Sequence, residues 1–172
     1  DPEAMARILA ECKADALGGF PVQILAVARM AAFLGLRLAP LSKVLLCSDY
    51  IPESLCRCLH DLLGCEVFSH YGTVETGLGG GVDCSAHCGC HLRETDLMFE
   101  IVDAESGMPL PEGRWGEIVC TTLARTGMPL IRYRTKDISR LTQEPCACGR
   151  TLIRMAKVSG RSDDMLIIRG AN

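Results

Sequence analysis

The chain has 172 residues, 48% of them hydrophobic, and a formal net charge of -3. This charge excludes a general nucleic-acid surface, which needs clustered basic residues, and no apolar run is long enough to cross a bilayer. The 11 cysteines, with no export signal, indicate free thiols in a reducing compartment, so we expect a cytoplasmic protein. Because the chain starts at Asp1 and stops abruptly at Asn172, we expect a fragment of a longer protein.

The first half of the chain alternates helical and strand-like patterns. Apolar residues recur at helical spacing in three segments, and two short apolar runs are typical of buried strands. We expect helices over residues 2–14, 22–34 and 52–63, a break over 16–20, and strands over 43–47 and 65–68, with a loop over 48–50. Alternation of this kind predicts a parallel sheet with right-handed crossovers.

After Gly81 the pattern changes to strands separated by turns. We expect strands over residues 97–102, 115–123, 128–133, 137–141, 151–155 and 165–169. The predicted fold class is therefore α/β, with a parallel βαβ half over residues 1–81 and a strand-rich, barrel-like half over residues 82–172.

One glycine-rich loop follows the strand predicted over 65–68. Tyr71 precedes a sharp turn at Gly72, and Thr73, Glu75 and Thr76 follow it. Glycine permits a positive φ and a close approach of the backbone to a ligand. Loops at the carboxyl ends of strands are where open α/β sheets bind ligands. The alternative is an ordinary connection with a solvated Glu75.

Cysteines and histidines gather in two short segments that lie far apart in the sequence. A closed tetrahedral zinc site needs four nitrogen or sulfur ligands, and soft thiolates with imidazole favour zinc over hard cations. We select Cys84, His91, Cys146 and Cys148, with Cys88 and Cys90 in place of Cys84 and His91 as the second choice. The alternative to a structural zinc site is a set of free thiols.

Two further residues have side chains suited to a nucleotide. Asp137 is placed directly after a predicted strand, where a carboxylate can accept hydrogen bonds from vicinal hydroxyls, as it does with ribose. The alternative is a surface carboxylate paired with Arg132 or Arg134. Arg161 follows a glycine and can pair with a phosphate or a ribose oxygen, or form a solvated ion pair in a turn.

Taken in order, four stretches resemble the adenylate-forming superfamily of acyl-CoA ligases. They are residues 69–75, 116–119, 133–137 and 160–164. The branch that the chain resembles is the phenylacetate-CoA ligase type, which is also similar in the Cys84–His91 segment and in residues 128–135 and 146–150.

The resemblance implies a role for each site residue. Tyr71 and Gly72 contact adenine, Thr73 or Thr76 approaches the phosphate, Glu75 holds Mg²⁺, Asp137 binds the ribose with Arg161 beside it, and Asp163 is the hinge of a C-terminal lid. It further implies ATP, which is cleaved to AMP and pyrophosphate, coenzyme A as co-substrate, an aryl acetate or similar carboxylic acid as substrate, and a homodimer. Neither nucleic acid nor a membrane is an expected partner.

The sequence departs from the family pattern at several points. Val74 replaces the usual Thr or Ser before Glu75, and Lys136 stands where the wider superfamily has Gly. The family also has a separate phosphate-binding loop, rich in Gly, Ser and Thr and containing a lysine, and a C-terminal lid with a catalytic lysine. Neither is present in this sequence, so we expect the isolated chain to be inactive. Two alternatives are a zinc-stabilised, non-catalytic interaction module and a nucleic-acid-binding zinc ribbon. The charge of -3 and the 5% aromatic content weigh against the ribbon.

Overall fold

The computed structural model describes residues 1–47 and 51–165, which divide into two units between Ser69 and His70. This division comes earlier than the predicted boundary after Gly81. The reason is that His70 and Tyr71 pair antiparallel with Val82 and Gly81, so the loop between them belongs to the second unit. The loop predicted over 48–50, and the strand predicted over 165–169 beyond Met165, lie outside the described residues.

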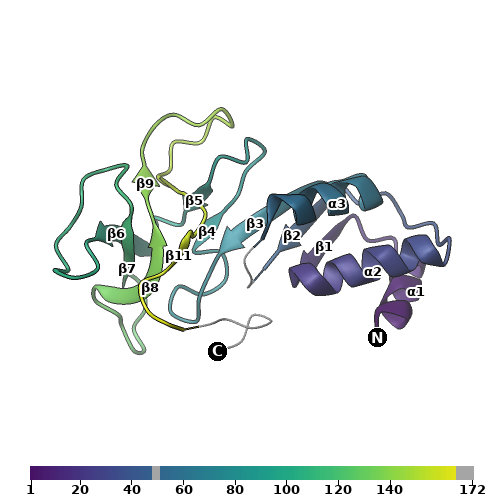
Figure 1. The fold of residues 1–172 in the computed structure, drawn as a ribbon, viewed down its shortest axis with the longest axis horizontal. Helices are drawn as coiled ribbons and strands as arrows, with labels where there is room; N and C mark the ends of the chain where they lie inside the picture. Colours follow the sequence, from purple (N-terminus) through teal and green to yellow (C-terminus); the bar gives the residue numbers. More distant parts are fainter. Residues whose placement is uncertain (48–50, 166–172) are drawn as a thin grey trace. The chain divides into compact units, whose positions relative to one another are not determined.

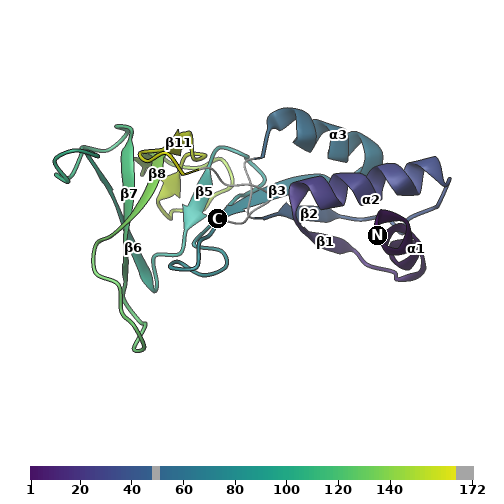
Figure 2. The same ribbon diagram turned by 60° about the horizontal axis from the view of Figure 1, so that its bottom comes forward.

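The first unit contains three helices and a parallel sheet, as predicted (Figure 1). In chain order its elements are α1 (Pro2–Glu11), β1 (Ala16–Gly19), α2 (Pro21–Phe33), β2 (Lys43–Leu46), α3 (Glu53–Leu63) and β3 (Glu66–Tyr71). The strands lie in the order β1-β2-β3, and α2 and α3 lie on the same side of β1 and β2 (Figure 2).

Local sequence signals explain where these helices begin and end. The Asp1 carboxylate accepts a hydrogen bond from the Glu3 amide at 2.9 Å, and Pro2 occupies the first turn of α1. Gly64 ends α3 with a φ of 65°, a left-handed conformation that suits glycine. The helices and strands enclose an apolar core that includes Val44, Leu46 and Leu59, each with no exposed surface.

Residues 16–20 interrupt the helical pattern as predicted, but the sequence did not indicate that residues 16–19 form a strand, β1. Two glycines in this short segment lower its apparent strand propensity. The strand forms because it pairs in parallel with β2, matching Leu17 to Val44. That partner is distant in sequence, so local composition does not reveal it.

The second unit consists of two antiparallel sheets. In the first, the end of β3 is followed in order by β4 (Gly81–Val82), β5 (Cys90–Leu92), β10 (Arg154–Met155) and β9 (Leu141–Thr142). The second sheet has the order β11 (Gly160–Arg161), β8 (Tyr133–Ser139), β7 (Gly116–Thr122) and β6 (Leu97–Val102). The predicted mixed α/β class, parallel first and strand-rich afterwards, is confirmed.

Strand β8 corrects another prediction. The sequence suggested separate strands over 128–133 and 137–141, whereas one strand spans Tyr133–Ser139. Met128 and Arg132 have positive φ values of 53° and 49°, so the segment before Tyr133 cannot be a regular strand. Within the described residues, no helix has both the length and the apolar character needed to span a membrane.

Candidate functional site

The loop after β3 is a tight turn held by its own hydrogen bonds. A Cβ atom at Gly72 would lie 2.8 Å from the Gly77 carbonyl oxygen, so a side chain does not fit there. The Thr73 amide donates to Thr76 Oγ1 at 2.9 Å, and the Gly77 amide donates to the Thr73 carbonyl at 2.8 Å. These contacts give the loop a fixed shape.

The polar side chains of this loop differ in accessibility. Thr76 is only 1% exposed and its hydroxyl is used within the loop, whereas Thr73 is partly exposed. Val74 is 90% exposed, so the position preceding Glu75 projects into solvent. The side chains of residues 73 and 74 are therefore accessible to a ligand, whereas that of Thr76 is not.

Glu75 is fixed by a residue that we did not select from the sequence. The Tyr133 hydroxyl donates to Glu75 Oε1 at 2.9 Å. Partial burial opposes ionisation of Glu75, but the hydroxyls of Thr73 and Tyr133 and the charge of Arg125 together lower its pKa. The same hydrogen bond raises the pKa of Tyr133, followed in effect by partial burial of the ring. Glu75 is thus an oriented carboxylate rather than a freely solvated one.

Asp137 lies inside β8 rather than after a strand, and it joins two of the other predicted residues. The Tyr71 hydroxyl donates to Asp137 Oδ2 at 2.9 Å, and Arg161 Nη1 donates to Asp137 Oδ1 at 2.7 Å. Asp137 is 7% exposed, and burial raises its pKa against the lowering effect of Tyr71 and Arg161. The structure therefore brings Tyr71, Asp137 and Arg161 together.

Arg161 also orients Asp163. Its Nε and Nη2 atoms donate to the two carboxylate oxygens of Asp163 at 2.7 and 2.9 Å. The hydrogen bonds from Arg161 lower the pKa of Asp163, which is exposed. One guanidinium consequently links the buried carboxylate of Asp137 to an exposed one.

The alternative partners considered for Asp137 are used elsewhere. Arg132 pairs with Glu100 at 3.1 Å. Arg134 donates to both oxygens of Glu117, from Nε at 3.0 Å and from Nη2 at 2.6 Å. Surface pairing of Asp137 with either arginine is therefore not what the structure contains.

Glu117 is a functional-site neighbour that sequence reasoning did not single out. Its side chain has no exposed surface, yet it accepts hydrogen bonds from Arg134, the Lys136 amide at 3.2 Å and the Ser162 hydroxyl at 3.2 Å. Burial opposes ionisation, but hydrogen bonding and charge from Arg134, with Lys136, lower the pKa of Glu117 overall. Glu117 lies opposite Ile138 where β7 pairs with β8, next to Asp137. This position identifies it as a neighbour of the site only once the strand pairing is known.

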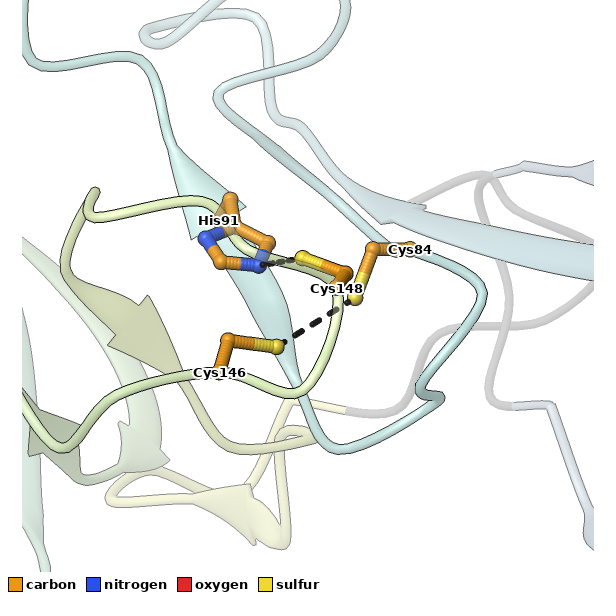
Figure 3. A group of neighbouring side chains, drawn as sticks. All are labelled: Cys84, His91, Cys146 and Cys148. Atoms are coloured by element: carbon orange, nitrogen blue, oxygen red, sulfur yellow. Dashed lines mark hydrogen bonds between the residues drawn. The ribbon is translucent and has the colours of Figure 1, made fainter.

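The four predicted metal ligands converge at one point (Figure 3). One ligand atom from each of Cys84, His91, Cys146 and Cys148 lies within 4.8 Å of the others. Cys84 Sγ is 3.7 Å from Cys146 Sγ, and Cys148 Sγ is 3.3 Å from His91 Nε2. Backbone hydrogen bonds from His87 to Cys84 and from Gly149 to Cys146 close the two turns that present three of these residues.

The groups around this Cys/His cluster orient the histidine ring and shift the pKa values of two of the thiols in opposite directions. His91 Nδ1 lies 3.2 Å from the Leu152 carbonyl oxygen, a contact that fixes the ring and leaves Nε2 facing the sulfurs. The Cys148 amide, together with the neighbouring thiols, lowers the pKa of Cys146 to about 7. Burial, followed in effect by the neighbouring thiols, raises the pKa of Cys84 to about 11.

The second-choice ligands are placed differently. Cys88 Sγ is 3.5 Å from Cys146 Sγ, but Arg154 Nη1 also contacts it at 2.8 Å. Cys90 is buried on β5 and is not among the four clustered ligands. No disulfide bond joins cysteines within the part of the chain that the structure describes.

Comparison with known proteins finds relatives of this chain in sequence. No family model matches it. It is 45% identical over 125 residues to a phenylacetate-coenzyme A ligase of Thermus thermophilus, covering 70% of this chain and 27% of that protein. It is 43% identical over 112 residues to a phenylacetate-coenzyme A ligase of Escherichia coli, covering 64% of this chain and 25% of that protein.

Solved structures share the fold. A 2-hydroxyisobutyryl-CoA ligase in complex with 2-HIB-AMP and CoA superposes with a TM-score of 0.89, at 24% identity, over 98% of this chain and 37% of that one. An amide bond synthetase from Marinactinospora thermotolerans superposes with a TM-score of 0.69, at 18% identity, over 100% of this chain and 36% of that one. The chain is therefore similar in sequence to phenylacetate-coenzyme A ligases and in fold to other CoA ligases, and it spans about a quarter of the length of the curated relatives that it matches.

Proposed function

We propose that this chain is part of an ATP-dependent acyl- or aryl-CoA ligase, which activates a carboxylate as acyl-AMP and transfers the acyl group to coenzyme A. The observation that carries the proposal is the meeting of Tyr71, Asp137 and Arg161. Tyr71 and Asp137 are 66 positions apart and lie on different strands, yet they share a hydrogen bond beside the glycine-rich loop. The names of the curated relatives support the same activity.

Asp137 retains the capacity to bind a ribose. Each of its oxygens accepts one protein donor, and a carboxylate oxygen has two lone pairs. One acceptor site on each oxygen is thus available for the two vicinal hydroxyls. Tyr71, at the end of β3, would supply the aromatic face for adenine next to Gly72.

Glu75 is suited to hold Mg²⁺, because Mg²⁺ prefers carboxylate oxygens and Tyr133 already orients this one. The ion would offset negative charge on the phosphates during adenylation. Of the two threonines, Thr73 is the better candidate for a phosphate contact, because the Thr76 hydroxyl is buried within the loop. Val74 offers no hydroxyl at its exposed position.

We also propose that Cys84, His91, Cys146 and Cys148 hold a structural zinc ion. Three sulfurs and one imidazole match the ligand chemistry of zinc, and four protein ligands leave no place for a reactive water. The ion would tie two turns that are far apart in the sequence. It takes no part in the acyl transfer that we propose.

Other expectations remain proposals of the same kind. Asp163 would be the residue about which a C-terminal lid rotates between the half-reactions. The substrate would be an aryl acetate or a similar acid, the whole enzyme a dimer, and its compartment the cytosol.

The test uses the full-length protein that contains this chain. Pyrophosphate release is followed with ATP, Mg²⁺ and a panel of aryl and short-chain carboxylates, with and without coenzyme A. Release that depends on one acid, with a thioester formed when coenzyme A is added, is the expected result. A folded, zinc-loaded protein that releases no pyrophosphate with any acid would favour the interaction module instead.

Asp137→Ala sharpens this test. Removing the ribose acceptor should lower kcat/KM for ATP about a hundredfold, which corresponds to two charge-assisted hydrogen bonds. The zinc content should stay unchanged, because Asp137 is not among the clustered ligands. Asp61→Ala, at an exposed position of α3, is the control. Unaltered ATP kinetics in Asp137→Ala would exclude the ribose role.

A further inference from the structure

Arg93 makes an unusual set of contacts with the glycine-rich loop. It follows β5 directly, and its side chain reaches back to that loop. Nη1 donates to the Leu78 carbonyl at 2.8 Å, and Nη2 donates to the Thr76 carbonyl at 3.0 Å. The Arg93 amide adds a bond of 3.0 Å to the Gly80 carbonyl.

The orientation of this guanidinium is itself fixed. Arg93 Nε donates to Asp96 Oδ1 at 2.7 Å, and the Asp96 pKa is lowered chiefly by that bond. Arginine presents its donors in a rigid planar fork, so one side chain can serve two carbonyls and a carboxylate at once. A lysine has a single flexible ammonium and cannot reproduce this geometry.

The carbonyls held by Arg93 belong to the same loop as Thr73 and Glu75. Thr76, whose carbonyl it binds, in turn accepts the Thr73 amide through its hydroxyl. Because Glu75 directly precedes Thr76, a displacement of Thr76 would also shift the backbone of Glu75. Arg93 itself is too far along the chain to be part of the loop motif, and it carries no role in the proposed chemistry.

We propose that Arg93 is a positioning residue for the glycine-rich loop after β3: it holds this loop in the conformation that exposes Thr73 and Glu75 to the nucleotide. This inference rests on the proposed function, in which those two residues face the phosphates and Mg²⁺. Arg93 directly follows β5, and β5 carries His91, so the proposed loop anchor and one of the clustered metal-ligand candidates are only two residues apart.

The decisive variant is Arg93→Lys in the full-length protein, with Arg132→Lys as the matched control. Arg132 also pairs with one carboxylate, that of Glu100, but the structure gives its side chain no bond to the loop. Hydrogen exchange is measured at the amides of Thr73 and Gly77, both of which are bonded within the loop. The KM for ATP, kcat, melting temperature and zinc content are measured on the same samples.

For Arg93→Lys we expect exchange at these two amides to become at least about tenfold faster, and the KM for ATP to rise about tenfold. Exchange in β7 and the zinc content should not change. Asp96→Asn should give a smaller effect in the same direction, and the double variant should show less than the sum, because both act through one contact.

Unchanged exchange in the loop would overturn the inference, whatever the kinetics. Faster exchange with unchanged KM and kcat would also overturn it, since the loop would then need no anchor for nucleotide use. If the wild-type protein uses no ATP, the proposed function fails and takes the nucleotide part of the inference with it. The exchange data would still decide whether Arg93 holds the loop.

Discussion

The two units of the molecule bury different kinds of side chain. Among the described residues, the buried polar and charged side chains all belong to the second unit: Thr76, His91, Glu117, Thr122, Thr135, Asp137, Ser139 and Arg154. The core of the first unit is apolar and includes Val44, Leu46 and Leu59. Burial of apolar area stabilises the first unit without specific partners, whereas each buried polar group in the second needs its own.

The polar contacts of the second unit both stabilise it and orient the residues of the candidate site. A polar interior is costly unless its hydrogen bonds are satisfied. In the second unit many of these bonds join residues far apart in sequence, whereas both ring nitrogens of His70 and the Nε atom of Arg154 are buried without a hydrogen-bond partner. The same contacts orient Asp137 and Glu75, so the groups that hold this unit together also form its candidate site. The comparison predicts that substitutions will act differently in the two units.

The largest effect is expected at the Cys/His cluster. Cys146→Ser should release zinc and destabilise the second unit by on the order of 5 kcal/mol, since binding to a structural site contributes to folding. Zinc content and the thermal unfolding profile of the full-length protein provide the measurement. Cys120→Ser is the control, because Cys120 is also buried but lies outside the cluster. Equal effects of the two substitutions would mean that no metal holds these turns.

A somewhat smaller effect is expected at Glu117. Glu117→Gln should cost about 4 kcal/mol at neutral pH, because it leaves the charges of Arg134 and Lys136 without their buried partner. The folded-state pKa of Glu117 is lowered, so its contribution is present above its ordinary value of 4.5 and is lost as the pH falls through the lower folded value.

Chemical denaturation at several pH values tests this. The gap between wild type and Glu117→Gln should be widest near neutrality and should narrow below a pH of about 4.5. Glu100→Gln, which removes a more exposed pair with Arg132, should cost less than about 1 kcal/mol. A gap that stays constant with pH would show that ionisation of the Glu117 carboxyl group does not account for its contribution to stability.

The smallest of the three effects is expected in the first unit. Leu46→Ala removes a fully buried side chain from β2 and should cost about 3 kcal/mol through lost burial and the cavity left behind. Zinc content should stay at the wild-type value. Leu62→Ala, at a position that is 37% exposed on α3, should cost much less. Zinc loss in Leu46→Ala would break the proposed division between an apolar and a polar unit.

The elements that could be predicted from the sequence are those specified by local patterns, and most of them lie in the first unit. Helices α1, α2 and α3 and strands β2 and β6 were predicted closely, because local periodicity and caps specify them. Strand β1 and the single strand β8 were not, since pairing with distant partners decides them. The short strands β4 and β5 were missed because two or three residues carry no pattern.

The candidate site was predictable only where a residue type is itself informative. The grouping of Cys84, His91, Cys146 and Cys148 was predicted from their chemistry, and the structure brings them together. Glu117 and Tyr133 lie in stretches that carry the resemblance but were given no role of their own, and Arg93 was not singled out, because a tyrosine, a glutamate and an arginine are common on any surface. Their importance comes from particular pairs, such as that between Tyr133 and Glu75, which no local pattern encodes.

The loop after β3 has a consequence for mutational tolerance. At Gly72, and to a lesser degree at Gly80, a side chain would press on neighbouring atoms 2.8 to 3.0 Å away, whereas Val74 and Leu78 are 90% and 76% exposed. Substitutions at the glycines should therefore alter the backbone conformation of the loop. Substitutions at the exposed positions should alter only the side chains that a ligand can contact. Residues 74 and 78 could thus change during evolution and alter ligand preference, while the backbone conformation of the loop stays the same.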